Sequence, residues 1–115
     1  MQIVNDTRHV ALAVHAERAA NMWMRGIGLM GRASLPEGYG LIIDPCKSIH
    51  MLLMRLPIDV CHVDRDDRVV RVLHSIRPWR VGPFVWMSHY VVELPAGTAR
   101  GTGTEVGDQL RMVDE

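Results

Sequence analysis

The longest mostly apolar run in the chain covers residues 48–64, S-I-H-M-L-L-M-R-L-P-I-D-V-C-H-V-D, and it limits what the chain can fold into. Five polar side chains are embedded in this run: His50, Arg55, Asp59, Cys61 and His62. An unpaired polar group is costly in apolar surroundings, so each of them must reach water, find a partner or belong to a site. The run therefore predicts a buried segment that carries a candidate polar site.

Short apolar or β-branched segments, separated by turn residues, recur along the chain. They predict strands at residues 10–14, 41–43, 50–54, 58–64, 69–74, 89–94 and 109–113. Helical spacing predicts one short N-terminal helix over residues 15–25, whose apolar face contains Ala16, Ala19, Ala20 and Trp23. About six or seven short strands with one helix are typical of a mainly β (α+β) domain, either a compact β-sandwich or jelly-roll-like fold or a partly closed barrel.

The clearest local prediction is a hairpin between residues 58–64 and 69–74. If Arg65 pairs with Arg68 across the turn, the period of two places Cys61 and Val63 on an inward face. The opposite face, with His62 and Asp64, suits solvent better.

The same register places Asp59 opposite His74 at the end of the inward face. A carboxylate beside an imidazole favours its protonated form, so we expect the pKa of His74 to be raised. A structural pair that fixes the strand ends and an acid–base dyad both fit this arrangement.

Length and charge limit the possible functions. A chain of 115 residues is long enough for one domain, and 13 basic residues balance 13 acidic ones. Without a net positive charge we expect no binding to nucleic acid and none to a membrane. The N-terminal residues do not form a signal peptide, and no run approaches the roughly 20 apolar residues that span a bilayer, so we expect a cytoplasmic protein.

Four segments, taken together and in order, resemble the signatures of one family. They are R-G-I-G-L-M-G-R at residues 25–32, M-R-L-P-I-D-V at 54–60, the acidic turn and Val-Val at 64–70, and E-L-P-A-G at 93–97 with Gly107-Asp108 further on. The chain is similar over about residues 12–112 to the uncharacterised prokaryotic family called domain of unknown function 192. This resemblance implies a compact, mainly β, jelly-roll-like domain and implies no established activity.

The chain departs from the family pattern at two places. Leu52-Leu53 stands where many members have a bulky aromatic pair, which puts an aromatic lining of any ligand site in doubt. Asp67 stands in the hairpin turn where many members have glycine, which affects only the turn geometry. Many relatives also carry export signals.

Metal and nucleophile chemistry find little support in the sequence. The spacings of His50, His62, His74 and His89 match no compact metal motif, and two cysteines are too few for a finger, so we expect neither a metal nor a cofactor. Cys61 and His62 are neighbours on a predicted strand and point to opposite faces, so they cannot pair directly.

Arginine and carboxylate side chains offer the remaining candidate site. Arg25 and Arg32 could bind a carboxylate, either Glu93 or Asp59 from within the protein or that of a ligand. The candidate site residues are Arg32, His50, Arg55, Asp59, His74 and Glu93.

Our leading hypothesis is a non-catalytic binding or accessory domain that binds a small polar ligand or a protein partner through an Arg/carboxylate pocket. The alternatives are a small hydrolase using Asp, His and Glu as acid and base, or a protein–protein interaction module with an exposed strand edge.

Overall fold

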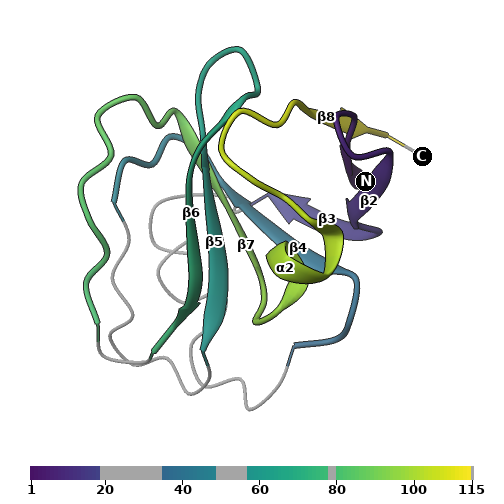
Figure 1. Ribbon diagram of the computed structural model, residues 1–115, viewed down its shortest axis with the longest axis horizontal. Helices are drawn as coiled ribbons and strands as arrows, with labels where there is room; N and C mark the ends of the chain where they lie inside the picture. The colour runs from purple at the N-terminus through teal and green to yellow at the C-terminus, as the bar shows by residue number, and fades with distance from the viewer. Residues whose placement is uncertain (19–34, 49–56, 78–79, 115) are drawn as a thin grey trace.

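The computed structural model describes residues 1–18, 35–48, 57–77 and 80–114. The elements in these ranges are β1 (Gln2–Asn5), β2 (Val10–Ala13), β3 (His15–Arg18), β4 (Tyr39–Ile43), β5 (Ile58–Val63), β6 (Val69–Ile76), β7 (Tyr90–Pro95), the short helix α2 (Thr98–Thr102) and β8 (Leu110–Val113) (Figure 1). The mainly β class predicted from the sequence is confirmed, and within the described ranges the sheets do not close into a barrel.

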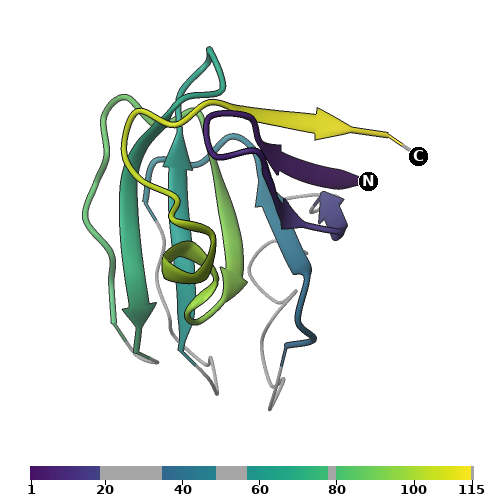
Figure 2. The ribbon, with the colours of Figure 1, turned by 45° about the vertical axis from the view of Figure 1, so that its right-hand side comes forward.

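The strands form two sheets. The larger has the order β3-β4-β7-β5-β6, and the smaller has the order β2-β1-β8. The strands of the smaller sheet run at a steep angle to those of the larger one, and both chain ends lie beside it (Figure 2). Because β1 pairs with β8, the first and last strands of the described chain are joined directly.

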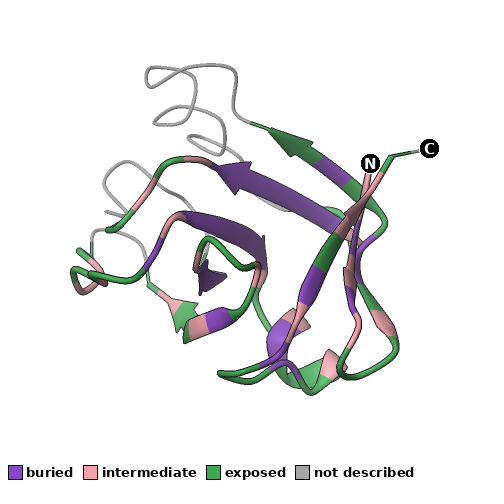
Figure 3. Cartoon of the chain, turned by 90° about the horizontal axis from the view of Figure 1, so that it is seen from above, coloured by how far each residue is buried: buried purple, intermediate pink, exposed green. Residues whose placement is uncertain are grey.

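Two apolar clusters cover opposite faces of the larger sheet. The first fills the space between the sheets and contains Ile3, Leu12, Ala13, Ala16, Ile42, Cys61, Val63, Val69, Tyr90, Val92, Leu94 and Leu110. The second lies on the other face and contains Tyr39, Leu41, Ile43, Ile58, Val60 and Val91. Alternate residues of β4, β5 and β7 therefore belong to opposite clusters, and Figure 3 shows these strands buried. Burial on both faces explains why β5 reads as a nearly continuous apolar run.

The hairpin register is correct in the middle and wrong at both ends. Cys61 pairs with Val72 as predicted, but bulges near Ile58 and between His62 and Val63 shift the flanking pairs. Asp59 consequently does not face His74 as a regular pair. His62, expected to suit solvent, is fully buried, and its ring contacts Ser88 in the segment before β7.

The N-terminal helix prediction is wrong for its first four residues. His15–Arg18 form β3, which pairs in parallel with β4 and buries Ala16 in the first cluster. Tertiary pairing here overrides a local alanine spacing that suits either structure. The other residues of that predicted helix face lie outside the described ranges, as does the strand expected at residues 50–54.

Close packing between β2 and β4 yields a stability prediction at Gly40. A Cβ at this position would lie 2.8 Å from the Cβ of Ala13, a rigid neighbour that cannot rotate away. We expect Gly40→Ala to lower the free energy of unfolding by about 1–3 kcal/mol, measured by denaturant titration. Gly101→Ala is the control, because its Cβ would meet no atom within 4 Å, and it should be neutral or stabilising by about 0.5–1 kcal/mol. Equal stability of the two variants would show that β2 and β4 can move apart to accommodate the added methyl group.

Candidate functional site

Asp59 is fully buried, and its carboxylate binds three backbone amides. Oδ1 accepts a hydrogen bond of 2.8 Å from the Ser75 amide, and Oδ2 accepts bonds of 3.0 Å from Gly97 and 2.9 Å from Ala99. Ser75 and Gly97 both have positive φ, 49° and 93°, so the carboxylate stabilises two unusual turns. Asp59 therefore ties β5 to the β6 bulge and to the start of α2, and its oxygens are committed to the scaffold.

The other expected polar residues do not gather around Asp59. His74 is exposed, and no ion pair joins it to Asp59 in the described structure. Arg32, His50 and Arg55 lie outside the described ranges. The proposed Asp59–His74 pair is thus incorrect, because the bulge delivers the Ser75 amide, and not the His74 ring, to the carboxylate.

Glu93 lies at the centre of the second face of the larger sheet. It is on the central strand β7, flanked by Leu41 of β4 and Val60 of β5. The side chain is buried, and no described residue forms a hydrogen bond or ion pair with its carboxyl. Burial raises the pKa of Glu93 to about 7.

The sheet separates the two buried carboxyls, Asp59 and Glu93. Asp59 is opposite Leu94 and shares its face with the first cluster, whereas Glu93 is opposite Val60 in the second cluster. Two carboxyls on opposite faces cannot act on one bound substrate as acid and base.

A buried contact between His62 and Ser88 was not expected from the sequence. His62 Nδ1 lies 2.8 Å from Ser88 Oγ, which also lies 2.7 Å from the carbonyl oxygen of Cys46. Since a hydroxyl has one proton, the short bond to the Cys46 carbonyl makes the ring nitrogen the donor to Ser88. His62 Nε2 has no partner in the described structure, and burial together with Arg71 lowers the pKa of His62 to about 4. The serine hydroxyl thus donates to the backbone and is not prepared as a nucleophile.

The buried cysteine is unreactive for a similar reason. Burial raises the pKa of the Cys61 thiol to about 12, with smaller contributions from Asp59 and Asp108. The thiolate is the nucleophilic form of cysteine, so Cys61 serves only in packing.

A second buried carboxylate holds the two ends of the chain together. Asp108 Oδ2 accepts hydrogen bonds from Asn5 Nδ2 at 2.9 Å, Arg8 Nε at 3.1 Å and the Glu105 amide at 3.0 Å. Burial alone raises the pKa of Asp108, but the hydrogen bonds outweigh it and the pKa is lowered. The Gly107-Asp108 signature could have drawn attention to this residue, whereas its partners Asn5 and Arg8, more than 90 positions away, could not be found from sequence spacing.

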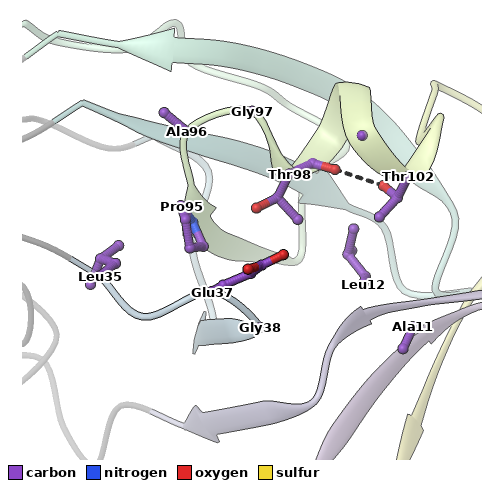
Figure 4. Close-up of a pocket in the computed structure, with 11 residues that line it drawn as sticks. Ala11, Leu12, Leu35, Glu37, Gly38, Pro95, Ala96, Gly97, Thr98 and Thr102 are labelled. Atoms are coloured by element: carbon purple, nitrogen blue, oxygen red, sulfur yellow. Dashed lines mark hydrogen bonds between the residues drawn. The ribbon is translucent and has the colours of Figure 1, made fainter.

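A cleft lies between α2 and strands β2 and β4, and it has a volume of about 540 Å³. Its lining residues are Ala11, Leu12, Leu35, Glu37, Gly38, Pro95, Ala96, Gly97, Thr98, Gly101 and Thr102. Figure 4 shows the carboxylate of Glu37 between β4 and the first turn of α2, with Thr98 near it. Among the described lining residues Glu37 has the single charged side chain, and Asp59 fixes the opposite wall through Gly97 and Ala99.

Comparison with known proteins places the chain in a family. Residues 3–112 match the model of the family described as DUF192, Uncharacterized ACR. The chain belongs to the DUF192 family. It is 32% identical to a UPF0127 protein of Pyrococcus abyssi, covering 96% of this chain and 97% of the relative. A UPF0127 protein of Pyrococcus furiosus is 31% identical, with coverage of 94% and 95%.

Two solved structures share the fold at 23% identity. One, titled a protein of unknown function from Novosphingobium aromaticivorans, has a TM-score of 0.81 and matches 96% of this chain and 82% of that chain. The other, titled a putative transcription regulator from Sinorhizobium meliloti, has a TM-score of 0.75 with coverage of 96% and 89%. At this identity the likeness extends to the fold alone.

The DUF192 signatures meet in space through Asp59. This residue ends the M-R-L-P-I-D segment, and its carboxylate binds Gly97, which ends the E-L-P-A-G segment. Asp64, in the acidic turn, accepts hydrogen bonds from the Asp66 and Arg68 amides at 2.9 and 3.0 Å. The signature carboxylates of Asp59, Asp64 and Asp108 thus have structural roles, whereas the carboxyl of Glu93 is buried and has no partner in the described ranges.

Asp59→Asn tests the central role of the carboxylate. Asparagine replaces one acceptor oxygen of the carboxylate with an NH2 group, which is itself a donor. At least one of the buried backbone N–H groups then loses its acceptor. We expect the free energy of unfolding to fall by about 2–3 kcal/mol, measured by denaturant titration. The exposed Asp66→Asn has the same chemical change and should stay within about 0.5 kcal/mol of wild type. Similar losses in both variants would contradict the assignment.

Glu93→Gln tests the burial of Glu93 through pH dependence. The folded state raises the pKa of this carboxyl from 4.5 to about 7, so the native protein holds a proton that the unfolded chain loses in this window. The stability contributed by the protonated form is complete below pH 4.5 and is lost as pH rises through 7. Because the variant stays neutral, its stability relative to wild type should increase over that window by up to about 3 kcal/mol.

The difference between the two proteins is the quantity to measure. His62 acts in the opposite direction, since its lowered pKa removes stability as pH falls from 6.5 toward 4. Subtracting the two unfolding curves at each pH cancels this contribution. A flat difference would mean that folding does not raise the pKa of Glu93.

Proposed function

We propose that this DUF192 domain is a non-catalytic binding module whose ligand occupies the cleft between α2 and strands β2 and β4. The observation that carries the proposal is the cleft itself, which has the size of small-molecule sites and a single charge among its described lining residues. Its α2 wall is fixed from below by the buried Asp59 carboxylate. A preformed wall lowers the conformational cost of binding.

The lining supports a ligand with a cationic group and a small apolar part. Glu37 supplies a carboxylate, Thr98 supplies a polar backbone and hydroxyl group, and Leu12, Leu35 and Pro95 supply aliphatic surface. The Arg/carboxylate pocket expected from the sequence would also accept an anion, but the described lining of this cleft contains no arginine. An amine or an amidine is therefore the ligand class that the cleft favours.

Among the residues that the structure describes, no acid and base groups converge on one point, which supports binding over hydrolysis. Asp59 is saturated by backbone donors, and Glu93 lies on the other side of the sheet from it. His62 and Ser88 are close together, but both are fully buried and the hydroxyl bonds to a carbonyl. In the described residues no other pair resembles a nucleophile with its base.

Matched pairs of cationic and neutral probes test the proposal. Benzamidine and cyclohexylamine should raise the melting temperature in proportion to occupancy, whereas benzamide and cyclohexanol should have little effect. Amide chemical shifts should move at residues 96–102. Glu37→Gln should weaken binding by roughly tenfold, about 1.4 kcal/mol, because the charged partner of the cation is lost.

Asp66→Asn serves as the control for loss of one exposed carboxylate remote from the cleft. It should bind the cationic probes as wild type does. Equal responses to cationic and neutral probes, or unchanged binding by Glu37→Gln, would contradict a Glu37-centred site.

A further inference from the structure

A concentration of exposed apolar side chains lies outside the lining of the cleft. Of the six large apolar side chains exposed in the described ranges, four fall within residues 81–87, which we call the aromatic loop. Their exposed fractions are 71% for Val81, 64% for Phe84, 77% for Trp86 and 64% for Met87. Exposed apolar residues gathered in this way are typical of an interaction surface.

The loop is held in place by the segment just after β4. The Val85 amide donates to the Lys47 carbonyl at 2.7 Å, and Lys47 Nζ donates to the carbonyls of Trp86 at 2.7 Å and Ser88 at 2.8 Å. Ser48 Oγ donates to the Gly82 carbonyl at 3.2 Å. These bonds fix the backbone along the outer edge of the molecule, where Figure 1 shows residues 80–89 in green. The apolar side chains themselves are not needed to shape the loop.

The ring contacts leave both aromatic side chains largely exposed. Phe84 and Trp86 have ring centroids 6.2 Å apart, and Lys47 Nζ lies 5.7 Å from the centroid of the Trp86 ring. Trp86 is nevertheless the most exposed of the four side chains. An aromatic pair next to a cation has the composition of side chains that favour the boundary between water and lipid.

Two further properties separate a lipid surface from other partners. In the loop the carbonyls of Gly82 and Trp86 and both backbone groups of Val85 are already bonded within the protein, and Pro83 has no N–H, so these groups stay satisfied in contact with an apolar phase. The sequence of residues 77–88 also contains Arg77 and Arg80 and no carboxylate, and Lys47 adds a third cation. This local excess of positive charge complements anionic head groups.

We propose that the aromatic loop docks the protein on an anionic lipid surface, with Phe84, Trp86 and Met87 entering the head-group region and the nearby cations facing lipid phosphates. The attachment is peripheral, and within the described residues no helix has the length and the apolar run needed to cross a bilayer. The net charge of the whole chain is zero, and from it we expected no membrane association. That total does not show the local excess of positive charge around the aromatic loop. The inference is independent of the cleft and its ligand.

Vesicle flotation with the full chain tests the proposal. Wild-type protein should float with vesicles of equimolar phosphatidylcholine and phosphatidylglycerol and float much less with pure phosphatidylcholine. The double variant Phe84→Ser, Trp86→Ser should lose at least about tenfold in partitioning, because both exposed rings are removed. Val106→Ser is the matched control, since Val106 is 63% exposed at a different turn, and it should float as wild type does.

Tryptophan fluorescence locates the contact. Lipids with brominated acyl chains should quench wild-type emission, and Trp86→Phe should retain flotation while losing most of the quenching. Circular dichroism and thermal melting of each variant verify that the fold is intact. Wild-type protein that floats with neither vesicle, or a double variant that floats as well as wild type, overturns the proposal. In the first case a protein with an apolar, acidic groove becomes the partner that fits the loop.

Discussion

The carboxylate of Asp59 is the interaction on which the rest of this structure depends. It accepts three backbone hydrogen bonds from two segments that are about 20 residues apart in the sequence, near Ser75 and at Gly97 and Ala99. Helix α2 has five residues and no side-chain cap of its own, and a helix this short is not stable in isolation. Asp59 accepts the Ala99 amide in place of a local capping residue. The wall of the cleft therefore rests on a residue of β5 that does not line it.

The contact between Asp59 and the Ser75 amide marks where the hairpin prediction from the sequence stops being correct. Period-two alternation correctly predicted the central hairpin pairs and the inward orientation of Cys61 and Val63. It failed next to Asp59, where the bulge at Ser75 turns a backbone amide toward the carboxylate. Sequence reasoning identified Asp59 as an unusual polar residue in an apolar run but assigned the wrong partner, His74. Backbone donors are common to every residue, so the sequence carries no signal for them.

Other differences come from contacts between distant segments. The β1–β8 pairing joins residues at opposite ends of the chain, and neither β1 nor α2 was predicted because both are short and depend on partners far along the sequence. The alanine spacing at His15–Arg18 also fits a helix, and this segment is a strand because it pairs with β4. The cleft belongs to the same class, since Leu12, Glu37 and Thr98 come from three separate segments. Of the predicted site residues, Glu93 keeps an unassigned, buried carboxyl.

The signatures that identify the family and the groups that could contact a partner are largely different residues. Asp59 and Asp64 bind backbone amides at the bulge and at the hairpin turn, and Asp108 holds the chain ends together through the side chains of Asn5 and Arg8. Glu37 and the aromatic loop lie outside all four signature segments. A change at Glu37 or in the loop alters exposed surface without removing any of those structural bonds. A match to the DUF192 signatures therefore indicates this scaffold and does not by itself identify a ligand.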